Sequence, residues 1–394
     1  MNDLKKKIAD LIFPNINQTV KDLEDKYPHR ELPKGAIVTR FAPSPTGFLH
    51  TGSLFTALVS YRFAKQTNGV FYVRLEDTDQ KREIKGSGEK VLEQLHTFGI
   101  VPDESYLNHD SIYGPYIQSQ RRAIYHTVIK EMLVSGDAYP CFCSHEELAE
   151  IRKHQEETKQ LPGYYKEFAK CRYLSDEDVI KRIQEGKPFV IRFKSQGSVD
   201  GRVQFNDAIR GTIEFPENIL DIVIMKSDGL PTYHFAHVVD DHFMGTTHVT
   251  RGEEWMSSTP IHIELFDRLR WEKPVYAHLP VIMKLDNGKR RKLSKRKDEE
   301  ASVDFFLEKG YPIEGFIEYL MTLANSNFEE WRLKHPNDDS DKFTLAFDKM
   351  SLDGALFDIE KIKSISKTKL SKLDKKTFTD LALIYSEMYE PRLA

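Results

Sequence analysis

The chain has 394 residues, of which 40% are hydrophobic and 30% are charged. That composition excludes a disordered or membrane-embedded chain, and at roughly 100–200 residues per domain the length predicts about two to four domains. Because the formal net charge is −4, a nucleic-acid partner would have to be bound by local basic patches.

The first residues, 1–35, read as a helical extension that ends near Pro33. They mix lysines with apolar residues and lack a long apolar stretch, so we expect no signal peptide. No apolar run approaches the roughly 18 residues of a membrane span, so we expect no membrane partner. The chain has three cysteines. An odd and sparse count argues against a disulfide framework and predicts a cytoplasmic protein.

The next segment predicts one βαβ unit. The apolar run Ala36–Phe41 reads as a buried strand, and Pro43–Gly47 as a loop. Apolar residues recur at helical spacing over Leu54–Ala64, and Val70–Leu75 reads as a second strand. Such units build parallel sheets, which bind ligands at the carboxyl ends of their strands. We therefore predict an α/β fold.

The pattern changes after Tyr116. A polar helix is followed by three short β-like runs, at Phe189–Phe193, Val203–Phe205 and Thr212–Phe215, which predicts an α+β insertion. The runs Ile219–Met225 and Thr246–Arg251 look like strands that return to the parallel sheet. The predicted segments are 1–35, 36–115 and 219–275 for the two halves of the parallel-sheet domain, 116–218 for the insertion, and the mainly helical 276–348 and 349–394.

Two motifs suit phosphate binding. In Pro43–Ser53, His50 and Gly52 stand where the first strand passes into a helix, whose free N–H groups suit a phosphate. Taken alone, this motif is better explained by an ordinary loop with a capping Thr or Ser. The basic run Lys289–Lys297 suits a mobile loop that brings ammonium groups to a triphosphate. Taken alone, it could equally be a solvated patch or a localisation tract.

Two further motifs are rich in charged residues. Arg74–Asp79 follows the second strand, where Glu76 could accept an amino group, although Asp-rich turns are common. Pro231–His242 contains three histidines and two aspartates, yet their spacing matches no metal site. We therefore interpret Pro231–His242 as a buried apolar element with structural polar residues.

Together these motifs resemble the class I aminoacyl-tRNA synthetases of the glutamyl type. The likeness extends from about Val38 to about Lys363. It rests on His50-Thr-Gly-Ser53, Lys292-Leu-Ser-Lys-Arg296, Arg40–Gly47, Arg74–Asp79 and Tyr233–Ala236. The resemblance implies a Rossmann-type parallel sheet, an insertion that binds the tRNA acceptor end, a helical stem-contact domain and the start of a helical anticodon-binding region.

The activity implied by the resemblance is that of a glutamate–tRNA ligase. Glutamate and Mg-ATP would form glutamyl-adenylate, and the glutamyl group would pass to the 3′-terminal adenosine of tRNA-Glu. We expect a monomer that binds glutamate, ATP and tRNA-Glu. The sequence leaves open whether tRNA-Gln is also charged.

The resemblance also implies roles for individual residues. Arg40, with Tyr233 beside it, would bind the side-chain carboxylate of glutamate, and Arg251 the α-carboxylate. Ser44 and Glu76 match positions near the α-amino group. His50 and Lys295 are the expected catalytic residues. The ATP positions would be His50, Gly52, Glu254, Trp255, Lys292 and Lys295.

All three cysteines fall in the predicted insertion. They resemble the zinc pattern of the family, whose four positions here are Cys141, Cys143, Cys171 and Tyr173. His145 and Glu167 are other candidate ligands. Zinc is normally bound by Cys, His or carboxylate, so a tyrosine ligand would be unusual. The alternative is that the three cysteines are buried and free.

The sequence departs from the family pattern at Ser53, which replaces a second histidine, and at Arg296, which replaces a serine. Family members continue through a larger helical anticodon-binding region, of which we expect only the beginning here. Codon-level selection of tRNA is therefore in question.

Four other functions are alternatives to a glutamate–tRNA ligase. A glutaminyl-tRNA synthetase would carry Pro-Glu-Pro-Asn where this chain has Pro43-Ser-Pro-Thr. A paralogue that glutamylates a modified tRNA base would end earlier. A non-catalytic RNA-binding paralogue should have lost His50, Lys295 or Arg40. A small-molecule nucleotidylyltransferase would not need Arg40, Tyr233 and Arg251 together.

Overall fold

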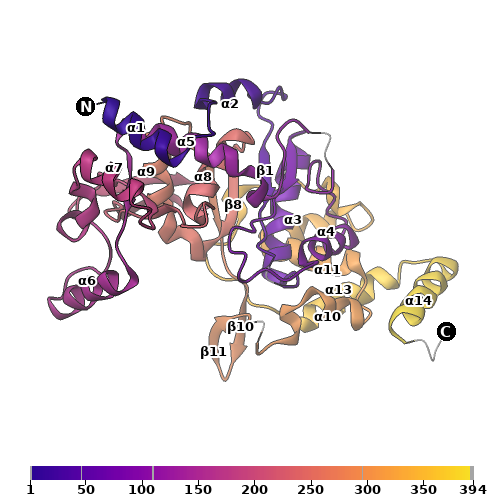
Figure 1. Ribbon diagram of the computed structural model, residues 1–394. Helices are drawn as coiled ribbons and strands as arrows, with labels where there is room; N and C mark the ends of the chain where they lie inside the picture. Colours follow the sequence, from indigo (N-terminus) through magenta and orange to yellow (C-terminus); the bar gives the residue numbers. More distant parts are fainter. Residues whose placement is uncertain (1, 46, 109–110, 295, 391–394) are drawn as a thin grey trace.

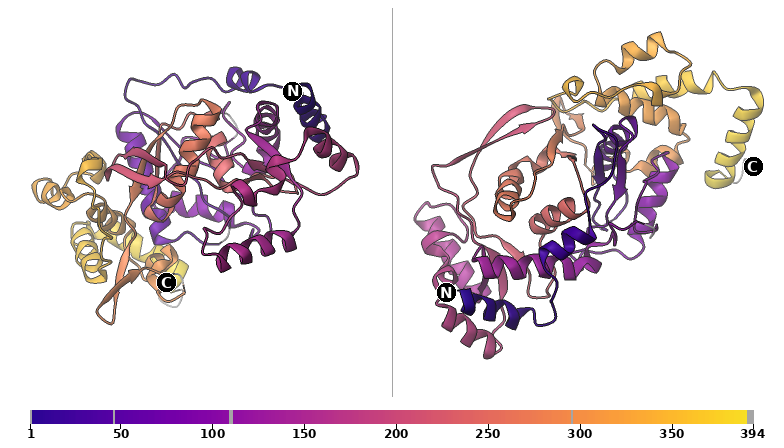
Figure 2. Two further views of the ribbon diagram at one scale, coloured as in Figure 1. Left: turned by 90° about the vertical axis from the view of Figure 1, so that its left-hand side faces the viewer. Right: turned by 90° about the horizontal axis from the view of Figure 1, so that it is seen from above.

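The computed structural model describes residues 2–45, 47–108, 111–294 and 296–390 (Figure 1). The N-terminal helices and the C-terminal helix lie at opposite ends of an elongated molecule (Figure 2). No helix among the described residues is both long and apolar enough to cross a bilayer.

The predicted βαβ unit is present at the centre of the molecule. Strand β1 (Val38–Phe41) passes through helix α3 (Thr51–Gln66) to β2 (Val70–Val73), and the two strands pair in parallel. Strands β8 (His248–Gly252) and β9 (Val275–Leu279) form a second parallel pair. The N–H of Thr247 donates to the carbonyl of Val38, which places β8 beside β1. All four residues of β1 and ten of the sixteen residues of α3 are buried, as expected for a parallel sheet that is covered by helices.

Two helices of the second half complete this domain. Helix α8 (Tyr233–Phe243) packs against α9 (Thr259–Leu269), and the short η4 (Glu253–Ser258) connects β8 to α9. The interpretation of Pro231–His242 as a buried structural element is confirmed, because most of α8 is buried.

The segments between β2 and α8 include a second sheet. Its strands β3 (Ala138–Cys141), β4 (Val190–Phe193) and β7 (Val223–Met225) are antiparallel. The predicted return of Ile219–Met225 to the parallel sheet is therefore wrong, because β7 pairs with β4. An apolar run predicts a buried strand but not its partner. The helices of this part are α4 (Ser87–Thr97), η1 (Gln118–Arg121), α5 (Arg122–Ser135), α6 (His145–Glu157), η2 (Lys166–Phe168), η3 (Lys170–Tyr173) and α7 (Asp176–Gln184).

The hairpin of β5 (Arg202–Asp207) and β6 (Gly211–Pro216) belongs to the central sheet. Its Asp207 pairs in parallel with Tyr276 of β9, so the strand order is β6-β5-β9-β8. Two of the three β-like runs predicted in the insertion thus extend the catalytic sheet.

The C-terminal part begins with the hairpin of β10 (Met283–Asp286) and β11 (Lys289–Lys292), so the first half of the predicted basic loop is a strand. Helix α14 (Lys375–Tyr389) carries several exposed apolar side chains and projects from the rest (Figures 1 and 2). The helices are η5 (Glu299–Ala301), α10 (Val303–Glu308), α11 (Ile313–Ala324), α12 (Phe328–Lys334), η6 (Ser340–Lys342), η7 (Phe347–Lys349), α13 (Ile359–Leu370) and α14 (Lys375–Tyr389).

The N-terminal extension connects two parts of the molecule. Helix α1 (Asn2–Ile12) packs on both α5 and α7, and α2 (Val20–Lys26) packs on α5 (Figure 1). Ile8 is 4% exposed and clusters with Val179 and Ile180 of α7. Farther along, Arg30 forms a bidentate pair with Glu104 at 2.7 and 2.8 Å. The extension thus holds the α7 region against the catalytic core.

We expect Ile8→Ala to lower the free energy of unfolding by about 2–4 kcal/mol, since it leaves a cavity between α1 and α7. Thermal or urea unfolding measures this. Lys6→Ala, on the exposed side of the same helix, should change stability by no more than about 0.5 kcal/mol. Equal effects of the two changes would show that α1 does not pack on α7.

Candidate active site

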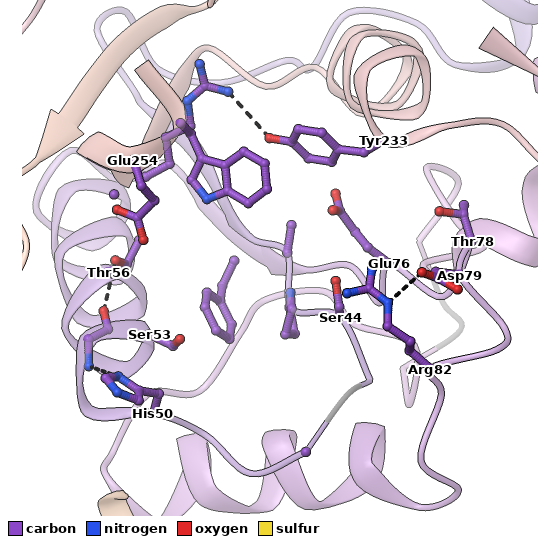
Figure 3. A pocket seen from close by; sticks show the side chains of 18 of the residues that line it. Ser44, His50, Ser53, Thr56, Glu76, Thr78, Asp79, Arg82, Tyr233 and Glu254 are labelled. Atoms are coloured by element: carbon purple, nitrogen blue, oxygen red, sulfur yellow. Dashed lines mark hydrogen bonds and ion pairs between the residues drawn. The ribbon is translucent and has the colours of Figure 1, made fainter. Parts of the chain in front are cut away.

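A cleft of about 1310 Å³ opens at the carboxyl ends of β1, β2 and β8 (Figure 3). This is the edge at which parallel sheets bind ligands. Most of the predicted substrate residues line it, namely Arg40, Ser44, His50, Gly52, Glu76, Tyr233, Arg251, Glu254, Trp255 and Lys292. The sequence places them up to 252 positions apart, and the fold brings them together. Lys295 lies outside the described residues.

One end of the cleft is formed by the N-terminus of α3. His50 is the N-cap residue, and its Nδ1 accepts a hydrogen bond from the N–H of Gly52 at 2.9 Å. A neutral His50 therefore carries its proton on Nε2. A Cβ atom at position 52 would lie 3.3 Å from that Nδ1, so glycine suits this tight turn. The helix N-terminus and its dipole make this end suitable for an anion.

An ion pair lies on the same side of the cleft as the N-terminus of α3. Lys292 Nζ of β11 lies 2.7 Å from Glu254 Oε1 of η4. The side chains of Lys292 and Glu254 are 54% and 44% exposed, so the pair contributes little to stability and can exchange for a charged ligand. The neighbouring Trp255 lies with its ring 4.7 Å from that of Tyr233. Through the contact between Trp255 and Tyr233, the predicted ATP positions reach the opposite end of the cleft.

The opposite end contains Arg251, which is 5% exposed. Its Nε donates to His278 Nε2 at 2.9 Å and its Nη2 to the Thr259 hydroxyl at 2.8 Å. Its Nη1 lies 3.2 Å from His262 Nδ1 and 3.5 Å from the Tyr233 hydroxyl, a contact dashed in Figure 3. All of these groups are uncharged when the histidines are neutral.

Burial favours the neutral form of those histidines. Desolvation lowers the pKa of His278, and it lowers that of His262 well below the usual value. Within the described part of the chain, no carboxylate forms an ion pair with Arg251. A buried guanidinium with only neutral partners is costly, and a carboxylate ligand would remove that cost.

Arg40, by contrast, already has a counter-ion. Its Nε lies 3.2 Å from Asp241 Oδ2, and its Nη2 lies 3.1 Å from His237 Nδ1. Asp241 also binds Arg74 at 2.8 Å. Burial alone would raise the pKa of Asp241, but Arg40 and Arg74 hold it below its usual value. Arg40 therefore enters the cleft with its charge partly neutralised.

Glu76 faces the same end of the cleft (Figure 3). Its Oε1 lies 3.1 Å from Arg74 Nη2 and 3.4 Å from Gln118 Nε2. Burial raises the pKa of Glu76, and Arg74 only partly opposes this effect. An ammonium group bound beside Glu76 would favour its ionised form.

The residues that hold these groups carry no predicted site role. Asp240 and Asp241 are predicted only as structural polar residues, which their buried ion pairs confirm, and no predicted motif includes Arg121, His278 or Asp207. The signal for Asp240 and Asp241 was present: two charged residues in an otherwise apolar helix need buried partners. For His278 and Asp207, no local pattern marks the role.

The three cysteines form a separate cluster. Their sulfur atoms lie within 4.8 Å of one another, and the Cys143 and Cys171 sulfurs are 3.6 Å apart. Hydrogen bonds from Cys143 and Cys171 hold the pKa of the Cys141 thiol well below its usual value. The tyrosine at the cluster is Tyr164, whose hydroxyl lies 3.3 Å from Cys143 Sγ. Tyr173, the predicted fourth ligand, is 67% exposed.

The other candidate zinc ligands lie elsewhere on the surface. His145 begins helix α6 and also lines the large cleft, and Glu167 is exposed within η2. The cysteine cluster comprises the only metal-type group of three or more His, Cys, Asp or Glu residues found in the described ranges.

Comparisons with known proteins agree on one family. The model for the catalytic domain of class I tRNA synthetases (E and Q) matches residues 36–364. The chain is 51% identical over 368 residues to the glutamate–tRNA ligase of Clostridium beijerinckii, covering 93% of this chain and 66% of that protein. It is 49% identical over 389 residues to that of Clostridium perfringens, covering 98% and 71%.

A solved structure is also similar. The glutamate tRNA ligase from Elizabethkingia meningosepticum, in complex with its amino acid, superposes with a TM-score of 0.77 at 36% identity. The match covers 86% of this chain and 71% of that one. This chain thus spans about two thirds to seven tenths of the length of these relatives.

We expect Asp241→Asn to lower the free energy of unfolding by about 3–5 kcal/mol at pH 7, because two buried arginines lose a counter-ion. Since the folded pKa of Asp241 is lowered, its contribution is present above the unfolded pKa of about 3.9 and is lost as pH falls through the folded pKa. The difference from the wild type should therefore shrink below about pH 4.

Denaturant titrations at several pH values measure this difference. Asp348→Asn is the control, because the Asp348 side chain is 75% exposed and should matter little at any pH. A difference between wild type and Asp241→Asn that does not vary with pH would contradict the assignment.

Proposed function

Since the chain belongs to the class I tRNA synthetases for glutamate and glutamine, we propose that it activates glutamate with ATP and transfers it to tRNA-Glu, as a cytoplasmic monomer. The predicted family, the α/β class I fold and the enzyme class are thereby confirmed. The relatives named above are glutamate–tRNA ligases, which favours glutamate over the glutaminyl alternative.

The observation that carries the proposal is the charge pattern of the cleft. Arg251 has no acidic partner among the described residues. Glu76 pairs with Arg74 at 3.1 Å, yet it also faces the cleft and burial raises its pKa, so a second cation beside it would favour its ionised form. A ligand with an ammonium group and a carboxylate would pair with both, and in glutamate the side-chain carboxylate can pair with Arg251 while the α-carboxylate stays free to react. The cleft opens at its other end onto the α3 N-terminus, which suits the phosphates of ATP.

The contacts refine the expected division of roles. Arg251, predicted to hold the α-carboxylate, lies against the Tyr233 hydroxyl. In the reaction the α-carboxylate must attack phosphorus, whereas the side-chain carboxylate stays ionised throughout. The uncompensated charge of Arg251 therefore suits the side-chain carboxylate, because that carboxylate keeps its charge throughout the reaction. We therefore assign the side-chain carboxylate to Arg251 and Tyr233, with Arg40 on its other side, and the ammonium group to Glu76 and Ser44.

The protein contributes position and charge to both steps. The α-carboxylate of glutamate attacks the α-phosphate of Mg-ATP, and pyrophosphate leaves. His50, Gly52 and the α3 N-terminus bind phosphate oxygens, and Lys292 stabilises the charge on the leaving group, together with Lys295 as the resemblance implies. A ribose hydroxyl of the terminal adenosine of tRNA then attacks the adenylate. No residue needs to act as a covalent nucleophile.

The direct test is charging of total tRNA with ATP and either radioactive glutamate or glutamine. We expect glutamate to be incorporated and glutamine not. Repeating the assay with separated tRNA-Glu and tRNA-Gln shows how the tRNA is selected. Incorporation of neither amino acid would overturn the proposed activity, and incorporation of glutamine alone would support the glutaminyl type.

The two cleft arginines should behave differently when replaced. Arg251→Gln should raise the KM for glutamate roughly 30- to 1000-fold, because a buried charged hydrogen bond is worth about 2–4 kcal/mol or more when its partner is left unpaired. It should not reduce stability by more than about 1 kcal/mol, since no counter-ion is left behind. Arg40→Gln should impair glutamate use and also destabilise the fold, because Asp241 loses a partner.

Steady-state kinetics with glutamate and with ATP, together with unfolding curves, separate these effects. Arg152→Gln, on the exposed face of α6, is the control and should leave the KM for glutamate unchanged. Unaltered glutamate kinetics in Arg251→Gln would remove Arg251 from the binding site.

We also infer that the cysteine cluster binds zinc, with Tyr164 nearer to the metal than Tyr173. In a tetrahedral site with Zn–S bonds of about 2.3 Å, the sulfurs are about 3.8 Å apart, close to the 3.6 Å between Cys143 and Cys171. Such a site would brace the loop between β3 and α6 against η3. It takes no part in the reaction described above.

Metal analysis of the purified protein should give about one zinc per chain, and Cys143→Ser should lose it. Tyr164→Phe should release zinc to a chelator faster than the wild type does, whereas Tyr173→Phe should not. A zinc-free wild type, prepared without chelators, would favour three free cysteines. Faster release from Tyr173→Phe alone would restore the ligand predicted from the sequence.

A further inference from the structure

We propose that Asp207 and His278 are positioning residues that aim the guanidinium of Arg251 at the glutamate side chain. Asp207 ends β5, His278 lies in β9 and Arg251 lies in β8. The three side chains form a continuous hydrogen-bonded chain and are at most 5% exposed. The proposal rests on the proposed function and adds two residues that neither bind substrate nor belong to any motif discussed above.

The geometry fixes the tautomer of His278. Asp207 Oδ2 lies 2.6 Å from His278 Nδ1 and 3.1 Å from the His278 backbone nitrogen, so it accepts hydrogen bonds from both. The proton of a neutral His278 is therefore on Nδ1, and the Nε2 lone pair points to Arg251. Arg251 Nε can only donate, and it does so to Nε2 at 2.9 Å. The other tautomer would place two donors face to face.

Asp207 is itself held in place. Its Oδ1 accepts from the N–H groups of Ile209 and Arg210, both at 3.0 Å. Arg210 pairs with Glu253 at 2.5 Å and donates to the His278 carbonyl at 3.3 Å. This turn lies where β5 meets β9. The β5–β6 hairpin thus brings a fixed carboxylate behind the binding site, in the way that outer carboxylates orient histidine ligands of metals.

The two terminal nitrogens of Arg251 each donate to a residue of helix α9. Thr259 accepts from Nη2 and His262 from Nη1, while the Tyr276 ring lies against the guanidinium, 4.8 Å from it. With three donors bound to neutral acceptors, the guanidinium has one orientation and keeps its full charge. Had Asp207 contacted Arg251 directly, the charge would have been neutralised. His278 therefore transmits the position of the carboxylate while keeping its charge one residue away.

A purely structural role makes different predictions from a positioning role. If the chain only stabilises the core, its loss lowers stability and affects glutamate, ATP and turnover alike. If it aims Arg251, its loss acts on glutamate. Asp207→Asn presents an NH₂ group either to His278 or to the N–H groups of Ile209 and Arg210. In the first case the proton of His278 moves from Nδ1 to Nε2. His278→Leu removes the acceptor. His278→Gln keeps an acceptor for Arg251 and a donor for Asp207.

The test compares these three variants with the wild type in glutamate charging of tRNA, with KM measured for glutamate and for ATP. We expect Asp207→Asn and His278→Leu to raise the KM for glutamate roughly 10- to 100-fold, with the KM for ATP within about threefold. His278→Gln should recover most of the loss. An unchanged KM for glutamate in both Asp207→Asn and His278→Leu, or an equal rise for glutamate and ATP, would overturn the proposal.

A second measurement is independent of activity and needs only His278→Gln, of the three variants, to fold. Nitrogen NMR of the imidazoles of the wild-type protein at pH 7.5, with His278 assigned by its absence in His278→Gln, should show the proton on Nδ1. A proton on Nε2 would overturn the proposal. If the wild type does not charge tRNA with glutamate, the proposed function fails on its own, and the tautomer still decides whether this chain of hydrogen bonds exists.

Discussion

Two adjacent aspartates in the last turn of helix α8 hold the catalytic domain together. Asp240 binds Arg121 at 2.7 Å and Asp241 binds Arg40 at 3.2 Å, while Arg74 contacts both. Successive residues of a helix point about 100° apart, so the pair reaches arginines from separate segments. The first strand, the end of the second strand and the start of the predicted insertion are thereby fixed to one helix. A network of this kind is stable only when every charge has its partner.

Arg251 is also buried but lies outside this charge-balanced network. Arg251 has hydrogen bonds in place of ion pairs, so its orientation is fixed while its charge stays available. Glu76 belongs to the edge of the network and faces the cleft. The binding end therefore carries a positive group, Arg251, with no acidic partner among the described residues, and a negative group, Glu76, that is paired with Arg74 on one side and faces the cleft on the other. Preorganised charge of this kind is a principal source of recognition and catalysis in enzymes.

The sequence predicted what depends on local pattern. The βαβ unit followed from apolar runs and helical spacing, and the signatures around His50 and Arg251 were found to meet in one cleft. Strand partners were not predictable: the run that became β7 has the composition of a buried strand and pairs with β4, away from the parallel sheet. Periodicity indicates that a strand is buried, but not what lies beside it. Likewise, Tyr164 lies seven residues before Cys171, and only the fold brings its hydroxyl to Cys143.

Helix α1 has a consequence for the synthesis of the chain. Its apolar face rests on α5 and α7, and Val179 follows Ile8 by about 170 residues in the sequence. At ribosomal rates of about 5–20 residues per second, α1 leaves the ribosome on the order of 10–35 s before its last partner is made. Until α5 is made, a short amphipathic helix has no docking site, and until α7 is made it has only part of one. Because such a helix is of marginal stability by itself, it is only partly stabilised during that interval. The first helix in the sequence is thus among the last parts of its half of the molecule to be fixed, and it locks α7 onto a core that has already formed.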